Sequence, residues 1–282
     1  MGKVYGLFGY PVGHSMSPIM HEAAFKELGQ KANYHAFNVK PDKIEEAVMA
    51  IRALELGGCN VTIPHKVNVM NYLDEIDPEA AEIGAVNTIV NQGGKLKGFN
   101  TDGRGYLQSL LEIAHTLEGK SVAIIGAGGA ARAIVTVLVH ESVSRLVVAN
   151  RTKIKAEQLI ERHKSKATEL GVMDMRELEY ELASFDIIIN TTSVGMSPNT
   201  DECPLSLNNL KKETIVSDLI YNPLKTKLLI EAESRGAKVL NGVGMFVNQG
   251  ALSFEYWTGL KPDRKVMTKI VLEQLGGTHV NR

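Results

Sequence analysis

Two side chains of opposite charge, Lys66 and Asp102, have the chemistry needed to move a proton when an alcohol is oxidised or a ketone is reduced. Asn60 and Thr62 alternate along one predicted strand, whose end brings Lys66 to the carboxyl edge of a sheet, where α/β proteins tend to bind ligands. The sequence offers no tyrosine–lysine motif, histidine cluster or zinc pattern for this task. We therefore predict that Lys66, as an ammonium, orients the substrate oxygen and stabilises alkoxide charge, and that Asp102 holds it. Which of the two carries the proton stays open at this stage.

Further polar residues stand at the ends of predicted strands and helices: Ser15, Ser17, Asn87, Tyr221 and Gln249. Such side chains suit a small polyhydroxylated acid. Taken alone, each has a simpler interpretation, because Ser17 could cap a helix and Asn87 could stabilise a turn. Their shared placement favours substrate binding.

A glycine-rich string, Gly126-Ala-Gly-Gly-Ala-Ala131, has the G-x-G-x-x-A form of a dinucleotide-binding turn. It directly follows a predicted strand, 122–125, and opens a helix, so the backbone can approach a pyrophosphate at the helix amino end. A tight turn with close helix packing is the alternative interpretation. The strand–turn–helix context favours cofactor binding.

The residues after the next predicted strand indicate which nucleotide is bound. A site for NAD usually carries an acidic residue there, but this chain has Asn150, followed by Arg151, Thr152 and Lys155. A carboxylate would repel a ribose 2′-phosphate, whereas a guanidinium can grip it. The alternative is that Arg151 and Lys155 are ordinary solvated cations. After the glycine turn, we favour NADP over NAD.

The first hundred residues alternate β-like and helical patterns. We predict a strand over 4–8, a helix over 18–28 capped by Ser17, and a helix over 44–51 opened by an Asp42–Glu45 capping box. A strand over 59–63 should stop at Pro64, and the run 86–90 with Gly93-Gly94 should form a hairpin.

From residue 121 the pattern becomes regular. Strands are expected over 122–125, 146–149, 186–190, 215–219 and 238–240, with helices starting at Gly129, Lys153 and Lys225. This alternation predicts a doubly wound parallel sheet of the Rossmann type. Two final helical patterns, 245–257 and 263–275, have no strand of their own to cover, and we expect them to return to the first domain.

Composition excludes several classes of protein. The 282 residues include 31 basic and 32 acidic side chains, so there is no net field for nucleic acid or a membrane surface. The apolar stretch 121–139 is interrupted by three glycines and Arg132, which argues against a membrane span. Two distant cysteines suggest neither a disulfide framework nor a metal site, and the amino terminus lacks a secretory pattern, so we expect a cytoplasmic protein.

Ordered motifs along the chain resemble the shikimate dehydrogenase family. In the first half these are Ser15-Met-Ser17-Pro18, Asn60-Val-Thr62-Ile-Pro64-His-Lys66, Gly84-Ala-Val-Asn87-Thr88 and Asn100-Thr-Asp102-Gly103. In the second half they are Gly126 to Ala131, Asn150-Arg151-Thr152, Asn190-Thr-Thr-Ser193-Val-Gly195-Met196, Ser217-Asp-Leu-Ile-Tyr221-Asn-Pro223 and Asn241-Gly242 through Met245 to Gln249-Gly250.

The resemblance implies reversible reduction of 3-dehydroshikimate to shikimate with NADPH, a step towards chorismate and the aromatic amino acids. It also implies an α/β substrate-binding domain over 1–103, completed by carboxyl-terminal helices over 243–282, and a Rossmann domain over 104–242. The active site would lie in the cleft between them.

The same resemblance implies roles for individual residues. Ser15 and Ser17 should meet the substrate carboxylate, and the residues that should meet its hydroxyls or reacting oxygen are Thr62, Lys66, Asn87, Asp102, Tyr221 and Gln249. The cofactor should be held by Gly126, Ala127, Gly128, Gly129, Ala130, Asn150, Arg151, Thr152, Lys155, Thr191, Ser193 and Leu219, with Gly242 and Met245 beside the nicotinamide.

Two other functions remain open from the sequence. A quinate/shikimate dehydrogenase would use NAD or NADP and accept a substrate with one more hydroxyl, although Arg151 and Thr152 argue against it. A non-catalytic sensor would bind the nucleotide and metabolite without turnover. The presence of both Lys66 and Asp102 favours the interpretation that the chain is an enzyme. The sequence does not distinguish a monomer from a homodimer.

Overall fold

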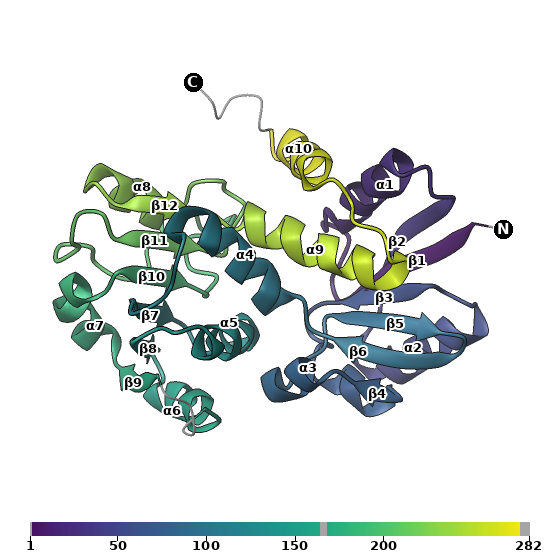
Figure 1. Cartoon of the computed structure of the whole chain (residues 1–282), viewed down its shortest axis with the longest axis horizontal. Coiled ribbons are helices and arrows are strands. Elements are labelled where there is room, and N and C mark those ends of the chain that lie inside the picture. Colours follow the sequence, from purple (N-terminus) through teal and green to yellow (C-terminus); the bar gives the residue numbers. More distant parts are fainter. Residues whose placement is uncertain (1, 164–167, 277–282) are drawn as a thin grey trace. The chain divides into compact units, whose positions relative to one another are not determined.

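The computed structural model describes residues 2–163 and 168–276, and the chain forms two compact units (Figure 1). Unit 1 comprises Met1–Gly105 and Val247–Arg282, and unit 2 comprises Tyr106–Phe246. The chain passes between the units inside two helices, α4 (Asp102–Ala114) and α9 (Val243–Thr258). Residues 277–282, assigned above to the carboxyl-terminal helices, lie outside the described residues.

Unit 1 contains a mixed sheet with strand order β2-β1-β3-β5-β6-β4. Its strands are β1 (Lys3–Gly9), β2 (Ala32–Asn38), β3 (Gly58–Val61), β4 (Glu75–Ile76), β5 (Thr88–Gln92) and β6 (Lys95–Phe99). The predicted hairpin is confirmed, because β5 and β6 pair antiparallel around Gly93 and Gly94, whose positive φ angles of 65° and 97° suit glycine. Strand β3 lies between parallel β1 and antiparallel β5.

The helices of unit 1 include α1 (Ser17–Glu27), α2 (Ile44–Ala53), α3 (Pro78–Ile83) and α10 (Arg264–Gln274). Helix α10 packs against α1. Helix α2 buries Ile44, Val48 and Ile51 at helical spacing, as its sequence pattern predicts. Trp257 near the end of α9 donates from Nε1 to the Ile89 carbonyl at 2.9 Å, which fixes that end of the helix to β5.

Three local predictions in unit 1 are wrong. Helix α1 begins at Ser17 itself, with Pro18 in its first turn, so the N-cap residue is Met16, which makes no side-chain cap. The Asp42–Glu45 capping box does not form, since Pro41 starts a short 3₁₀ turn (Pro41–Lys43) and Asp42 lies inside that turn. Strand β3 ends at Val61 rather than residue 63, three residues before Pro64, which cannot donate to the ladder.

Unit 2 contains a six-stranded sheet in the order β12-β11-β10-β7-β8-β9 with every neighbouring pair parallel, which confirms the doubly wound fold. The strands are β7 (Ser121–Ile125), β8 (Arg145–Ala149), β9 (Glu169–Met173), β10 (Ile187–Asn190), β11 (Ile215–Asp218) and β12 (Lys238–Leu240). The helices between them are α5 (Gly129–His140), α6 (Lys153–Glu161), α7 (Met175–Glu181) and α8 (Lys227–Ser234).

Strand β7 shows how both faces of this sheet are covered. Val122 and Ile124 pack with residues of α5 and α6, whereas Ala123 and Ile125 pack with residues of α7 and α8. Successive side chains of a strand point to opposite faces, so a sheet covered on both faces needs a continuously apolar strand. The run of apolar residues after Ser121 therefore belongs to a buried central strand.

A buried polar network ties α9 to the sheet of unit 1. Asn60 accepts a hydrogen bond from the Tyr34 hydroxyl at 2.8 Å, and its amide nitrogen donates to Ser253 Oγ at 3.0 Å. Thr88, which pairs with Asn60 across β3 and β5, lies 2.7 Å from Ser253 Oγ through its own hydroxyl. Ser253 donates in turn to the Gln249 carbonyl one turn earlier at 2.9 Å. Ser253 thereby joins three segments of unit 1.

We expect Ser253→Ala to lower the free energy of unfolding by about 1–3 kcal/mol, because the buried Asn60 amide and Thr88 hydroxyl each lose a partner. Urea unfolding followed by circular dichroism measures the change. The matched control is Ser234→Ala, whose exposed hydroxyl donates to the Glu231 carbonyl at 2.8 Å and whose removal should change stability by under about 0.5 kcal/mol. Equal stability of the Ser253→Ala variant and the wild type would contradict the structural role.

Candidate functional site

The structure brings Lys66 and Asp102 into direct contact. Lys66 follows β3, and Asp102 is the first residue of α4, which begins three residues after the end of β6. Lys66 Nζ donates to Asp102 Oδ2 at 2.6 Å, with 28% of the lysine side chain and 11% of the aspartate side chain exposed. A carboxylate this deeply buried needs an opposite charge and further hydrogen bonds. The lysine ammonium meets the first need and keeps part of its surface open.

Asn87 meets the second need. Its amide nitrogen donates to Asp102 Oδ1 at 2.9 Å, and its amide oxygen accepts from the Thr101 backbone at 2.8 Å. Asn100 accepts from the Asp102 backbone N–H at 3.0 Å and donates to the Ala85 carbonyl at 3.0 Å. Both Asp102 oxygens are therefore held, so the carboxylate is fixed in one orientation beside the ammonium.

The two serines predicted to meet a carboxylate also lie together. Ser15 Oγ donates to Ser17 Oγ at 3.1 Å and accepts from the Ser17 backbone N–H at 3.2 Å. Ser17 also lies within hydrogen-bonding reach of the buried Tyr34 hydroxyl, and burial raises the pKa of Tyr34 well above its usual value. The pair therefore presents neutral hydroxyl groups next to the buried network, with Ser15 the more exposed of the two.

Three further predicted substrate residues belong to unit 1 and differ in exposure. Thr62 is half-buried directly after β3. Gln249 is half-buried on α9. Gly105 packs closely against it, because a Cβ at Gly105 would lie 2.6 Å from the Gln249 backbone nitrogen. Asn60, in contrast, is 6% exposed and uses both ends of its amide within the protein. Its contacts are those of a residue that positions others.

Ser253 and Tyr34 were missed by the sequence analysis. Ser253 stands four residues after Gln249 in the helical pattern, so it occupies the same helix face, and this spacing was the available signal. His21, stacked on Tyr34 with ring centroids 4.5 Å apart, was also missed. Burial lowers the pKa of His21 to about 3, so its ring is neutral at physiological pH.

In unit 2, the glycine turn has the shape that a phosphate needs. Gly126 follows β7 with φ +104°, and a Cβ there would lie 2.6 Å from Thr191 Oγ1. Gly128 and Gly129 have no neighbouring atom within 4 Å of where a Cβ would stand, and no side chain caps α5 at Gly128. The helix amino end, which carries free N–H groups and a partial positive charge, therefore faces open space. These residues fit a nucleotide pyrophosphate.

The neighbouring strands end at the same edge because all of them are parallel. Thr191 follows β10 and donates to the Ile125 carbonyl at 2.7 Å, and the Leu219 backbone, after β11, donates to the Asn190 carbonyl at 3.1 Å. A Cβ at Gly242 would overlap the Leu219 carbonyl, so only glycine allows this approach. The remaining predicted cofactor contacts of unit 2 are Ala127 in the turn, Ala130 in the first turn of α5, exposed Ser193, and Met245, which packs against the core.

A buried carboxylate stiffens these strand ends. Asp218, at the end of β11, accepts from Thr226 Oγ1 at 2.7 Å and from Asn190 Nδ2 at 3.1 Å. Burial raises the pKa of Asp218, while these hydrogen bonds and one from the Ile220 backbone favour its charged form. The loops that follow β10 and β11 are thereby tied to each other.

The predicted 2′-phosphate residues follow β8. The Asn150 side chain donates to the Thr152 carbonyl at 2.8 Å, and Thr152 precedes α6 without capping it by its side chain. Arg151, Thr152 and Lys155 are exposed, and within the described residues neither cation is in an ion pair. The segment therefore offers unpaired cations and no carboxylate at the position where NAD sites carry one.

Tyr221 belongs to unit 2, whereas Lys66 and Asp102 belong to unit 1. Its ring packs on Phe246 with centroids 5.0 Å apart. Burial raises the pKa of Tyr221, so its hydroxyl is protonated at neutral pH and can donate a hydrogen bond.

The described part of the chain has neither a cluster of metal ligands nor a membrane-spanning helix. Residues 2–163 and 168–276 bring together no group of three or more histidine, cysteine or acidic side chains able to hold a metal ion. Within the same ranges, every helix is too short or too polar to cross a membrane.

Comparison with known proteins gives the same family along the whole chain. Residues 7–89 match the shikimate dehydrogenase substrate binding domain, residues 108–203 match shikimate / quinate 5-dehydrogenase, and residues 242–272 match the shikimate 5'-dehydrogenase C-terminal domain. A relative from Geobacillus sp. (strain WCH70), named shikimate dehydrogenase (NADP(+)), is 54% identical over 98% of this chain and 100% of its own length.

Two solved structures are similar over nearly their whole length. A shikimate dehydrogenase in complex with NADP+ is 43% identical, with a TM-score of 0.91, covering 97% of this chain and 96% of that one. Shikimate 5-dehydrogenase from Listeria monocytogenes, in complex with shikimate and NAD, is 40% identical, with a TM-score of 0.91 and 96% of each chain covered. By its three matching domains and these similarities, the chain belongs to the shikimate dehydrogenase family.

Proposed function

We propose that this chain catalyses the reversible, NADP-dependent interconversion of shikimate and 3-dehydroshikimate. The observation that carries the proposal is the Lys66–Asp102 pair, 2.6 Å apart and held by Asn87, in a chain of the shikimate dehydrogenase family. A pair of this kind, together with a bound nicotinamide nucleotide, is sufficient for alcohol oxidation, which removes a hydride from carbon and a proton from oxygen.

Lys66 and Asp102 would manage the proton. Bound NADP supplies the hydride acceptor, and the chain's own residues handle the oxygen. In the oxidative direction the pair takes up the hydroxyl proton as the carbonyl forms, and in the reductive direction it returns a proton to the developing alkoxide. The exposed part of Lys66 would contact the reacting oxygen, where its charge stabilises the alkoxide. Asn87 fixes Asp102 and leaves the ammonium in place.

The remaining substrate contacts follow from exposure and hydrogen-bonding chemistry. The Ser15 and Ser17 hydroxyls, with no acidic partner, suit the substrate carboxylate. Thr62, Gln249 and the protonated Tyr221 suit ring hydroxyls. Asn87, which is 2% exposed and whose amide is bonded to Asp102 and Thr101, is assigned to positioning. Asn60 we assign to positioning because its amide is used within the buried network.

The nucleotide would be held by the carboxyl edge of the unit 2 sheet. Gly126, Gly128 and Gly129 leave room for the pyrophosphate at the α5 amino end, and the ribose phosphate would meet Arg151 and Lys155, with Asn150 and Thr152 as neutral donors. Thr191, Ser193, Leu219, Gly242 and Met245 would line the path towards the nicotinamide.

The cysteines bear on the compartment in which the protein works. Both cysteines are free, with Cys59 buried, which fits a reducing compartment and hence the cytoplasm. We propose a monomer or a homodimer as the working form.

Initial-rate measurement of nicotinamide reduction tests the function directly. With purified full-length chain, we expect the highest kcat/KM for shikimate with NADP, and lower values when quinate replaces shikimate or NAD replaces NADP. Preferred turnover of quinate with NAD would instead identify a quinate dehydrogenase. Binding of shikimate and NADP without any absorbance change would identify a sensor.

The cofactor preference has its own test. Arg151→Ala should raise the KM for NADP by about tenfold to a hundredfold, because a charge-assisted hydrogen bond to the 2′-phosphate is lost. The KM for NAD, which has no such phosphate, should hardly change. Arg162→Ala, which removes an exposed arginine just after α6, is the matched control and should leave both values unaltered. If the ratio of the KM for NAD to the KM for NADP were unchanged in the Arg151→Ala variant, Arg151 would not contact the 2′-phosphate.

A further inference from the structure

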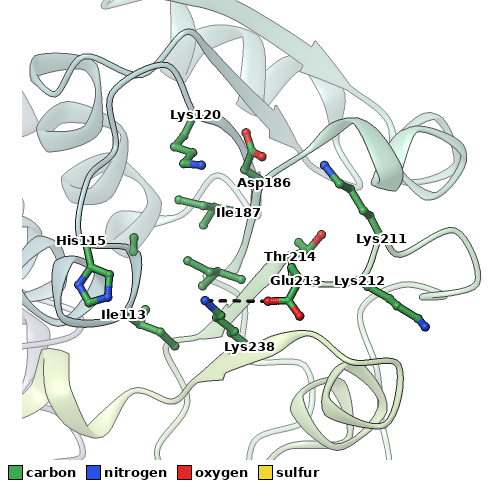
Figure 2. A pocket seen from close by; sticks show the side chains of 12 residues that line it. Ile113, His115, Lys120, Asp186, Ile187, Lys211, Lys212, Glu213, Thr214 and Lys238 are labelled. Atoms are coloured by element: carbon green, nitrogen blue, oxygen red, sulfur yellow. Dashed lines mark ion pairs between the residues drawn. The ribbon is translucent and has the colours of Figure 1, made fainter.

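A pocket of about 290 Å³ opens at the amino-terminal edge of the unit 2 sheet (Figure 2). Its lining includes Asp186 and Ile187 at the start of β10, Thr214 and Ile215 at the start of β11, and Lys238 at the start of β12. The nucleotide residues stand at the carboxyl ends of the same strands. The pocket is therefore separate from the nucleotide edge, and no step of the proposed reaction uses it.

The rim of this pocket is rich in positive charge. It carries four lysines, Lys120, Lys211, Lys212 and Lys238, against two carboxylates. Within the described residues, Lys238 is the only one of the four in an ion pair. Bringing lysines together without matching acids costs electrostatic free energy, which an anionic ligand would offset.

The first carboxylate, Asp186, is already used by the protein. Its Oδ2 accepts from the Ser121 backbone and from Ser121 Oγ, both at 3.0 Å, which joins β7 to β10. Burial acts to raise the pKa of Asp186, but these hydrogen bonds and the charges of Lys120 and Lys211 outweigh it, and the pKa is lowered. Figure 2 shows the carboxylate between these two lysines, neither of which reaches it as an ion pair.

The second carboxylate, Glu213, neutralises Lys238 only weakly. Its oxygen lies 4.0 Å from Lys238 Nζ, and the two side chains are 78% and 54% exposed. Exposed pairs at such a distance contribute little and reform easily with another anion. Lys238 is therefore also available to a ligand.

Part of the pocket wall is apolar. Ile113 and Ala114, half-buried at the end of α4, contribute this surface, whereas Ile187 and Ile215 are 0% and 8% exposed and belong to the core behind the wall. A fully hydrated inorganic ion would gain nothing from such surfaces, whereas a carbon ring or short chain would. The volume is near the lower end of the range for small-molecule pockets.

We propose that this pocket is a binding site for a small organic dianion with an apolar ring, whose acidic groups meet the rim lysines and whose ring contacts Ile113 and Ala114. The proposal is independent of the chain's catalytic function.

Two-dimensional ¹H–¹⁵N NMR of the full-length chain tests it with three probes at neutral pH. Phthalate has a ring and two carboxylates, benzoate has the ring with one, and succinate has two carboxylates without a ring. We expect phthalate to shift the amides of residues 120–121 and 211–215 saturably, with a Kd about tenfold lower than that of either other probe, since each lacks one of the two interactions.

Charge variants identify the groups responsible. K120M/K211M should weaken phthalate binding by about tenfold or more, and K120R/K211R, which keeps both charges, should preserve it. The matched control K225M/K227M removes two lysines of unit 2 that lie outside the pocket and should bind phthalate as the wild type does. Unaltered shikimate turnover in all three variants would verify that each is folded.

Several results would overturn the proposal. These are shifts confined to residues 126–131 and 150–155, equal phthalate binding by K120M/K211M and the wild type, or equal binding of succinate and phthalate. The first result would show that phthalate binds at the nucleotide edge. The second would show that Lys120 and Lys211 do not contribute to binding. The third would show that the apolar ring does not contribute.

Discussion

The buried ion pair between Lys66 and Asp102 is the interaction that much of unit 1 serves to stabilise. A carboxylate with 11% of its side chain exposed is unfavourable unless it is paired and hydrogen-bonded. Asn87 holds one oxygen, Lys66 holds the other, and Asn100 holds the backbone from which the carboxylate extends. The result is an ammonium in a fixed position with part of its surface open, which is the property needed to stabilise a negative oxygen.

The fold brings these groups together from separate strands. Lys66 follows β3, Asn87 precedes β5 and Asp102 follows β6, and these strands are neighbours in one sheet. Behind them, the Asn60–Thr88–Ser253 hydrogen bonds attach α9, which carries Gln249. In unit 2 the parallel order of the strands has the corresponding effect, because it gathers Gly126, Thr191 and Leu219 at one edge.

Sequence reasoning succeeded where a signal was local. The apolar strands of unit 2, the glycine turn after β7 and the β5–β6 hairpin each follow from short patterns. Two predicted caps failed because prolines next to Ser17 and Asp42 changed where the first turn begins. The edge strands β2 and β9 were missed, since they lie half-exposed and lack the continuous apolar run of a central strand. Asn60 and Ser253, which form a hydrogen bond, are 193 residues apart in the sequence. Periodic patterns relate only residues that are close in sequence, so they could not predict this contact.

A double-mutant cycle on Lys66 and Asp102 tests most directly whether these two groups act as one unit. Lys66→Met and Asp102→Asn, alone and together, would be compared by kcat for NADP reduction by shikimate, with thermal unfolding recorded for each variant. Each single change should lower kcat by about 10²–10⁴-fold, and the double change should lower it hardly further, because either loss already disables the pair. Losses that multiply in the double variant would contradict this account and show that the two residues act independently.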